Sequence, residues 1–187
     1  MKLWLRLFYE LISWRFRGRL KVTDVGRRNF RVWPTDLDIF AHMNNGIFLT
    51  LQDTARFDLM LRSGVWQLWK SLGWYPVVVA ASITYRKSLT PWQSFAIETK
   101  LIGADDQAFY VDQRFVVGDE VYSRSIVRIR LLKRSRGIVT PAEALAQGDW
   151  PQALPELPSW VVDWAKSANL PKGKEPAVSD WPWPADL

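Results

Sequence analysis

The feature that most restricts the fold of this chain is a change of hydrophobic period near residue 76. From Gly46 to Leu61 the run GIFLTLQDTARFDLML has apolar residues on nearly all sides, which is typical of a helix buried within a domain. After Pro76 come four runs of strand character, VVVAASITYRKS, SFAIETKLIG, AFYVDQRFVVG and VYSRSIVRIRLLKR. Because their short connections join antiparallel neighbours, we expect an α+β domain in which a four-stranded meander folds against one buried helix.

A short strand and a polar loop precede this helix. The stretch RNFRVWP reads as a strand that ends at Pro34, which cannot donate to a strand ladder. The loop DLDIFAHMNNG, from Asp36 to Gly46, then gathers two carboxylates, the only histidine of the chain and two asparagines. Asn44 or Asn45 is the predicted N-cap of the helix.

Composition limits the chemistry that the chain can perform. A length of 187 residues predicts one domain with appendages. The absence of cysteine excludes disulfides, thiolate nucleophiles and cysteine-ligated metals, and with a single histidine we expect neither a metal centre nor a cofactor. Carboxylates, one imidazole, amides and backbone dipoles remain for any catalysis.

The first residues form a basic, apolar arm. Met1 to Arg31 carries a local net charge of +7, whereas the rest of the chain sums to −1. Up to residue 17 the polar side chains fall on one narrow helical stripe (Lys2, Arg6, Glu10, Ser13 and Arg17). Charges interrupt the arm too often for a membrane span. Two interpretations remain: a helix at a membrane surface, using residues 1–20, or a helix packed on the body or on a partner chain.

The last part of the chain differs in composition from the rest. Eight of the eleven prolines lie from Pro141 onward, interleaved with tryptophans. We expect one helix over about residues 159–168, and an extended arm that the tryptophans dock in part. The predicted organisation is an arm at 1–26, a domain at 27–140 and an extension at 141–187.

The residues from 27 to 133 carry a family likeness. A strand, the loop DLDxxxHMNNxxxL, a helix containing DxAR and four antiparallel strands together resemble the hotdog-fold thioesterases. The likeness is to the hydroxybenzoyl-CoA thioesterase group and to the thioesterase superfamily member 6-like proteins. The loop also looks like that of plant acyl-carrier-protein thioesterases. The resemblance implies a central helix wrapped by a curved antiparallel sheet, a homodimer or dimer of dimers, and active sites at the dimer interface beside the helix N-terminus.

The resemblance assigns candidate catalytic roles within the loop. Asp38 matches the catalytic carboxylate, which attacks the thioester carbonyl or deprotonates a water. His42 resembles the loop histidine, which orients the acid or donates to the leaving thiolate. Asn45 and the first helical N–H groups are expected to stabilise the oxyanion. The structural alternatives are a turn cap for Asp38, a neutral histidine that satisfies backbone groups, and a helix N-cap for either asparagine.

Candidate substrate-binding residues extend beyond the loop. Asp53 is a second candidate base or the partner of Arg56 in a structural ion pair. Arg128 and Arg130 either grip the phosphates of coenzyme A or protect a solvated sheet edge. The acyl tail is expected along Phe48, Leu51, Ala55 and the strand at 77–81. The substrate-binding candidates are Asn44, Gly46, Phe48, Asp53, Arg128 and Arg130.

These observations predict a cytoplasmic thioesterase of lipid metabolism, peripheral to the membrane, that hydrolyses a fatty or aromatic thioester of coenzyme A or of acyl-carrier protein. The sequence departs from the plant pattern at Phe40, and it carries Thr84 and Ser88 where an additional acid is expected. The alternative is therefore an acyl-binding or membrane-peripheral scaffold protein with reduced or no turnover. We expect no nucleic-acid partner, because the sheet lacks interleaved aromatic and basic residues.

Overall fold

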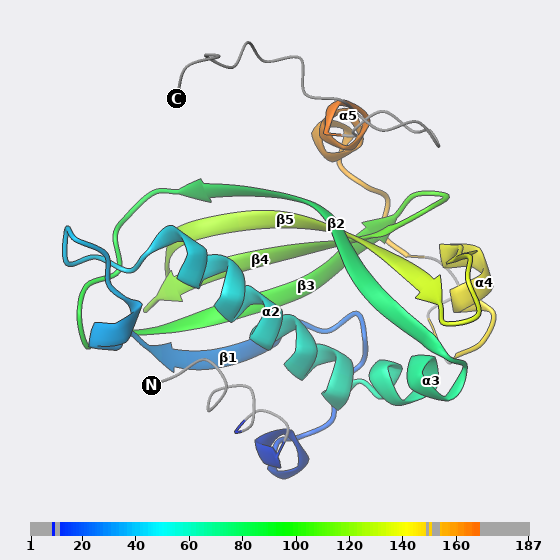
Figure 1. Ribbon diagram of the computed structural model, residues 1–187, viewed down its shortest axis with the longest axis horizontal. Helices are drawn as coiled ribbons and strands as arrows, with labels where there is room; N and C mark the ends of the chain where they lie inside the picture. The colour runs from blue at the N-terminus through cyan, green and yellow to red at the C-terminus, as the bar shows by residue number, and fades with distance from the viewer. Residues whose placement is uncertain (1–8, 10–11, 149, 151–153, 169–187) are drawn as a thin grey trace, which may run out of the picture.

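The computed structural model describes residues 9, 12–148, 150 and 154–168, and it shows a curved antiparallel sheet wrapped around one long helix (Figure 1). The helix is α2 (Asn45–Arg62), and the sheet lies along its whole length. The predicted α+β class and the predicted central helix are confirmed.

Local signals fix the two ends of α2. The side chain of Asn44 accepts a hydrogen bond from the N–H of Gly46 at 2.8 Å, so Asn44 is the N-cap. At the other end Gly64 adopts a φ of +80°, which ends the helix before α3 (Val65–Ser71) begins. Both ends fall within one residue of the predicted run.

The strands form at the predicted places, but their order differs from a meander. They are β1 (Gly26–Arg31), β2 (Trp74–Tyr85), β3 (Ser94–Ala104), β4 (Phe109–Val117), β5 (Glu120–Lys133) and the short β6 (Ile138–Val139). The order in the sheet is β1-β3-β4-β5-β2, with β6 also paired to β5.

The prediction that β2 and β3 are neighbours is therefore wrong. β2 pairs with β5 along nearly its whole length, and residues 86–93 carry the chain from β2, at one edge of the sheet, to β3, which lies beside the opposite edge strand β1. This connection is anchored where the N–H groups of Arg86 and Lys87 donate to the carbonyl of Tyr122. Leu89, which is fully buried, accepts a hydrogen bond from the N–H of Met43, so the crossing passes beside the loop that precedes α2.

The core between α2 and the sheet consists of two apolar clusters separated by a polar layer. One cluster includes Phe48 and Phe115, and the other includes Trp69 and Phe109. The layer joins α2 to three neighbouring strands and comprises Gln52, Arg56, Thr99, Gln113 and Ser125. Within it the side-chain amide of Gln113 donates to the Thr99 hydroxyl and to the backbone carbonyl of Gln52, both at 3.0 Å. The guanidinium of Arg56 donates to the side-chain oxygen of Gln113. The apolar pattern of the sequence did not predict this layer.

The C-terminal extension contacts both faces of the sheet. The predicted helix is α5 (Ser159–Ser167), which lies on the side away from α2 (Figure 1). Its Val161 and Ala165 pack against Tyr110 and Ile126. Before α5, the short α4 (Pro141–Leu145) is followed by Trp150, whose ring stacks on Phe109 with centroids 5.9 Å apart. Trp181 and Trp183 lie outside the described residues.

Most of the basic arm also lies outside the described residues, so the predicted amphipathic helix is untested over residues 1–8 and 10–11. Where the description resumes, a short helical turn η1 (Trp14–Phe16) leads to Arg17, whose guanidinium pairs with Asp58 at 2.9 Å. Arg62 donates to the carbonyl of Gly18 at 2.7 Å. The end of the arm is thus fastened to α2. Among the helices that the structure describes, none combines the length and apolarity of a bilayer span.

Candidate functional site

The loop before α2 is a closed turn. Leu37 and Met43 form an antiparallel bridge, and inside it the N–H of Asp38 donates to the carbonyl of His42 at 2.8 Å. The N–H of Ala41 donates back to the carbonyl of Asp38 at 3.1 Å, and Ala41 itself has a φ of +57°. A left-handed alanine carries backbone strain, which the surrounding hydrogen bonds hold in place.

The carboxylate of Asp38 is held by one oxygen only. Its Oδ1 accepts hydrogen bonds from the N–H groups of Phe40 at 2.9 Å and His42 at 3.3 Å. Within the described part of the chain Oδ2 accepts none, and the side chain is half-buried. The turn-cap interpretation of Asp38 is therefore correct for one oxygen, and the other is left for a ligand or water.

The tip of the loop is open. Ile39 is 93% exposed and Phe40 is 73% exposed. His42 is exposed too, and it is tied to Asp38 through backbone hydrogen bonds. The turn thus holds the backbone of His42 against Asp38, beside the exposed side chains of Ile39 and Phe40.

The first turn of α2 begins directly after this loop. The N-cap, Asn44, already occupies the N–H of Gly46, and its carbonyl accepts from Ile47 at 2.9 Å. The N–H of Asn45 has no acceptor among the described residues, and its carbonyl receives the Tyr85 hydroxyl at 3.4 Å. Of the first helical amides, that of Asn45 is therefore available to an incoming oxyanion.

A second carboxylate, that of Asp53, lies two turns farther along α2. Its side chain is 69% exposed, and it receives a hydrogen bond from Arg56. Arg56 is almost fully buried, and this burial lowers its pKa to about 10. The guanidinium also donates to Gln113, so Arg56 connects the exposed acid to the polar layer of the core. The predicted Asp53–Arg56 pair is confirmed.

The predicted phosphate ligands are on the opposite face of the sheet. Arg128 is 5% exposed and pairs with Asp105 at 3.0 Å, and Arg130 donates to Gln107 at 2.6 Å. They alternate with Val127 and Ile129, which face α2 and α3, so the structure does not bring them to the loop.

The pair of Asp105 and Arg128 contains an ionised acid. Burial acts to raise the pKa of Asp105, but hydrogen bonds from Tyr110 and from the backbone N–H groups of Gln107 and Ala108, with the charge of Arg128, outweigh it and hold that pKa below its ordinary value. Burial and the neighbouring carboxylate raise the pKa of Tyr110. The groups of this cluster bind one another, as in a network that stabilises the fold.

The path predicted for the acyl tail is filled by side chains. Phe48, Leu51 and Ala55 are at most 3% exposed and pack into the apolar cluster on the inner face of the sheet. The ring of Phe48 contacts Phe115 and Tyr85, with centroids 4.7 and 5.0 Å away. Phe48 therefore supports the start of the helix from below.

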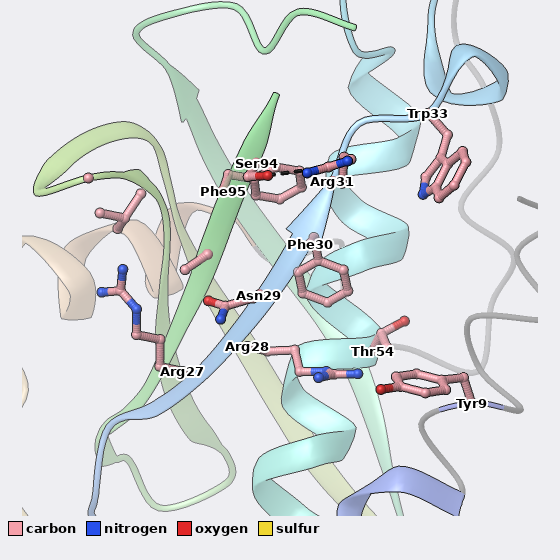
Figure 2. Close-up of a pocket in the computed structure, with 13 residues that line it drawn as sticks. Tyr9, Arg27, Arg28, Asn29, Phe30, Arg31, Trp33, Thr54, Ser94 and Phe95 are labelled. Carbon is pink, nitrogen blue, oxygen red and sulfur yellow. Dashed lines mark hydrogen bonds between the residues drawn. The ribbon is translucent and has the colours of Figure 1, made fainter. Parts of the chain in front are cut away.

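Sequence reasoning did not identify a cleft of about 580 Å³ along β1 (Figure 2). Its arginines are Arg27, Arg28 and Arg31, which the sequence analysis counted with the basic arm. Arg28 lies over the ring of Tyr9 at 5.3 Å, close to α2 (Figure 2). The only available signal was the density of arginine at an edge strand, and neither Asp38 nor His42 lines this cleft.

Among the described residues no group of three or more histidine and acidic side chains could hold a metal ion.

A match to a known family covers the loop, α2 and the strands β2 to β5. The model of the thioesterase-like superfamily aligns with residues 32–165. The chain belongs to this superfamily. This membership agrees with the likeness carried by the loop and the helix. The matched region also extends into α5.

Individual relatives agree with the superfamily assignment. Protein THEM6 from Xenopus laevis is 39% identical over 137 residues, which make up 72% of this chain and 64% of that protein. The chain thus spans slightly less than two thirds of that relative's length. The probable thioesterase YbaW from Escherichia coli has a TM-score of 0.61 at 20% identity, over 65% of this chain and 96% of that one.

A second solved structure is similar in the same way. The 1,4-dihydroxy-2-naphthoyl-CoA thioesterase from Synechocystis has a TM-score of 0.56 at 13% identity, over 68% of this chain and 100% of that one. At such identities the likeness concerns the fold, and it confirms the predicted hotdog architecture of the superfamily.

Proposed function

We propose that the protein hydrolyses acyl thioesters, with Asp38 as the reacting carboxylate. The observation that supports this most is the arrangement of that side chain: Oδ1 is fixed by two backbone N–H groups, whereas Oδ2 has no partner among the described residues. A carboxylate that is oriented but not fully satisfied is suited to general-base or nucleophilic work. Membership of the thioesterase-like superfamily supports the same reaction.

The proposed reaction uses the start of α2 for positioning. Asp38 takes a proton from water while the water oxygen attacks the thioester carbonyl, or its Oδ2 attacks directly and water then cleaves the anhydride. In both routes the carbon–sulfur bond breaks, and the thiolate leaves with a proton that His42 can supply. The N–H of Asn45 and the positive end of the helix stabilise the oxyanion. Asn44 holds the first turn, and Gly46 keeps the surface there free of side chains.

We further propose that the site is completed by a second copy of the chain. Val78, Val79 and Tyr85, at the free edge of β2, are between 39% and 47% exposed, and Leu49 on α2 is 43% exposed. An exposed apolar edge strand favours pairing with another strand. A homodimer joined along β2 would cover this edge and bring a partner surface toward the exposed Phe40. Further pairing of dimers remains part of the proposal.

The dimer can be tested separately from the chemistry. Val79→Lys places a charge on the proposed edge, and Val25→Lys places one at an equally exposed valine near the other edge of the sheet. Sedimentation velocity should show monomers for the first variant and dimers for the second. A wild-type protein that sediments as a monomer, or a dimeric Val79→Lys variant, would contradict the proposed interface.

For the substrate we propose an acyl thioester of coenzyme A, with acyl-carrier protein as the other carrier to be tested. The Synechocystis neighbour is named for an aromatic acyl-CoA, which supports including aromatic substrates beside fatty ones. In the proposed dimer the acyl group would lie over Leu49 and Gly46, with Asp53 at the far end of this exposed helix face. Arg128 and Arg130 take no part, because they face the other side of the sheet and are already engaged.

We propose that the protein is cytoplasmic and touches membranes through residues 1–20. Tyr9, Ile12 and Phe16 are 58%, 45% and 86% exposed, and basic residues lie among them. Apolar and basic side chains together favour an anionic lipid surface. The double variant Ile12→Glu with Phe16→Glu should reduce co-sedimentation with anionic vesicles, and unchanged co-sedimentation would rule out this contact.

The central test is thiol release from a panel of aliphatic and aromatic acyl thioesters. Because the chain contains no cysteine, a thiol reagent reads only the product. We expect turnover by the wild type, its loss in Asp38→Asn, and its retention in Asp106→Asn, which changes an exposed acid elsewhere. Ligand-dependent thermal stabilisation without turnover in any protein would instead favour the alternative of a non-catalytic acyl-binding protein.

A further inference from the structure

A small apolar chamber lies between the second half of α2, α3 and the sheet. Its volume is about 50 Å³, and its walls are almost entirely apolar, among them Leu59, Met60, Trp69, Phe109 and Trp150. Met60 is fifteen residues beyond Asn45, which corresponds to roughly 22 Å along a helix. The polar layer of Gln52, Arg56, Thr99 and Gln113 lies between the two places, so the chamber is separate from the proposed thioester site.

A surface cleft of about 600 Å³ adjoins the chamber. The cleft is bounded by residues 20–23, by the turn between α2 and α3, and by Gly148 and Trp150. Val22, Ser63, Val65 and Trp150 line both spaces, so the chamber and the cleft adjoin at these residues. A pocket of this size is typical of small-molecule sites, and the chamber alone would take only the end of an alkyl chain.

Trp150 is the part of this wall that the C-terminal extension supplies; most of the other wall residues come from the sheet, α2 and α3. Its ring stacks on Phe109 and also on Trp69, with interplanar angles of 13° and 22°. A Cβ at Gly148 would approach the Nε1 of Trp150 to 2.6 Å, so the glycine lets the indole lie close to the chain. The chain thus contributes a specific aromatic cover to an otherwise open end of the core.

Most polar groups around the chamber have partners, the exception among the described residues being the buried Nε1 of Trp69. Arg56 is bound to Asp53 and Gln113, Thr99 receives the Gln113 amide, and the Ser63 hydroxyl donates to the Met60 carbonyl. Apart from that single indole N–H, a polar group that entered there would meet apolar walls and would lose its hydration without compensation. The interior therefore suits a hydrocarbon chain.

The mouth of the cleft has the opposite character. Lys21 lines it and is exposed, and no acidic side chain among the described residues pairs with its ammonium group. A negative head group at the mouth would gain a charge partner while its tail remained in the apolar interior. The cation thus lies at the mouth and the apolar walls lie inside, which matches the charged head group and the hydrocarbon tail of a single-chain anionic amphiphile.

We propose that this cleft and chamber bind a long-chain carboxylate, with the end of the tail under Trp150 and the carboxylate beside Lys21. Four of the ten residues that line the cleft, residues 20–23, precede the region that the superfamily model matches. The site does not require that Asp38 be catalytic, and Asp38→Asn should bind the carboxylate as the wild type does.

The test is calorimetric titration of the full-length protein with dodecanoate. Val22→Trp fills the junction, whereas Val25→Trp adds the same bulk at an exposed position three residues away. We expect saturable one-to-one binding that Val22→Trp weakens at least tenfold and Val25→Trp leaves within twofold. Lys21→Glu should weaken it several-fold, in contrast to Lys70→Glu, an exposed lysine on α3 outside the cleft.

Three results would overturn the proposal: no saturable binding by the wild type, binding by Val22→Trp as tight as by Val25→Trp, or equal binding of dodecanol and dodecanoate with no effect of Lys21→Glu. Circular dichroism and thermal melts of Val22→Trp establish that it is folded. If that variant is unfolded, Trp150→Ala provides the decision, because removing the cover must change the dodecanoate affinity at least threefold.

Discussion

The two ends of α2 treat their charged side chains in opposite ways. At the N-terminal end Asp38 is half-buried and keeps one carboxylate oxygen without a partner among the described residues. At the C-terminal end Asp58 is 1% exposed, and its two oxygens face Arg17 at 2.9 Å and Arg62 at 3.4 Å. One end presents an acid to solvent on an exposed loop, and the other encloses an acid between two cations.

This difference indicates that one acid stabilises the fold and that the other is available for a reaction. A buried carboxylate that is fully paired fixes neighbouring segments, and removing it leaves buried cations without compensation. A carboxylate that is held but not saturated can still accept a proton or attack a carbonyl. On this basis Asp58 fastens the N-terminal segment to α2, whereas Asp38 is the candidate for reaction.

The largest stability effect is expected at the enclosed end. Asp58→Asn should reduce the free energy of unfolding by about 3 kcal/mol, because Arg17 and Arg62 remain in a site that water reaches poorly. Denaturant titration measures this, with Asp106→Asn as the exposed control. If the free energy of unfolding falls by less than about 1 kcal/mol, Asp58 does not hold the N-terminal segment to α2.

Asp105 is a paired acid far from α2. It tests whether ion pairing, and not a position on α2, makes an acid contribute to stability. Asp105→Asn should cost about 2 kcal/mol at neutral pH, because Arg128 and Tyr110 lose an ionised partner. The pKa of Asp105 in the fold is below its ordinary 3.8, so this contribution is complete above that pH and disappears as the pH falls through the folded value. The difference between wild type and variant in unfolding free energy should therefore shrink below about pH 4; a constant difference would contradict the charge-based explanation.

The capping residue of α2 should have a smaller effect. Asn44→Ala removes the acceptor for the Gly46 N–H and should cost about 1 kcal/mol. Asn29→Ala, at an exposed position on β1, should change the stability by less than half as much. Equal losses in thermal and denaturant melts would show that the cap contributes nothing specific.

The strained turn should give the smallest effect, and one of opposite sign. Ala41→Gly relieves a left-handed alanine but increases the entropy of the unfolded chain, so we expect a gain of about 0.5 kcal/mol. The same substitution at the exposed Ala142, within α4, should be destabilising. A loss of stability in Ala41→Gly would mean that the loop is held by contacts of the methyl group.

The sequence predicted the elements well because their signals are local. The buried run from Gly46 to Leu61 and the N-cap at Asn44 locate α2, and alternating strand residues locate β2 to β5. The order of the strands was missed because the pairing of β2 with β5 depends on contacts between distant residues. No local signal in residues 86–93 indicates that the chain crosses there from β2 past β5 and β4 to β3.

Two further features were invisible for the same reason. The polar layer depends on register, which places Gln113 opposite Thr99 on one side and opposite Ser125 on the other. The loop acids were identified from their motif, yet only the structure shows which oxygen of Asp38 the backbone occupies. The face on which Arg128 lies likewise follows from strand register and from the placement of Asp105.

The most direct test compares the two acids that flank the exposed start of α2, Asp38 and Asp53. Single-turnover thiol release from the best acyl-CoA would be measured for Asp38→Asn and Asp53→Asn, each shown to be folded. The account predicts that Asp38→Asn is at least roughly a hundredfold slower than the wild type, as expected for loss of a general base, while Asp53→Asn stays within about tenfold. A nearly unimpaired Asp38→Asn, with activity lost in Asp53→Asn, would contradict the account and move the chemistry from the loop to the helix.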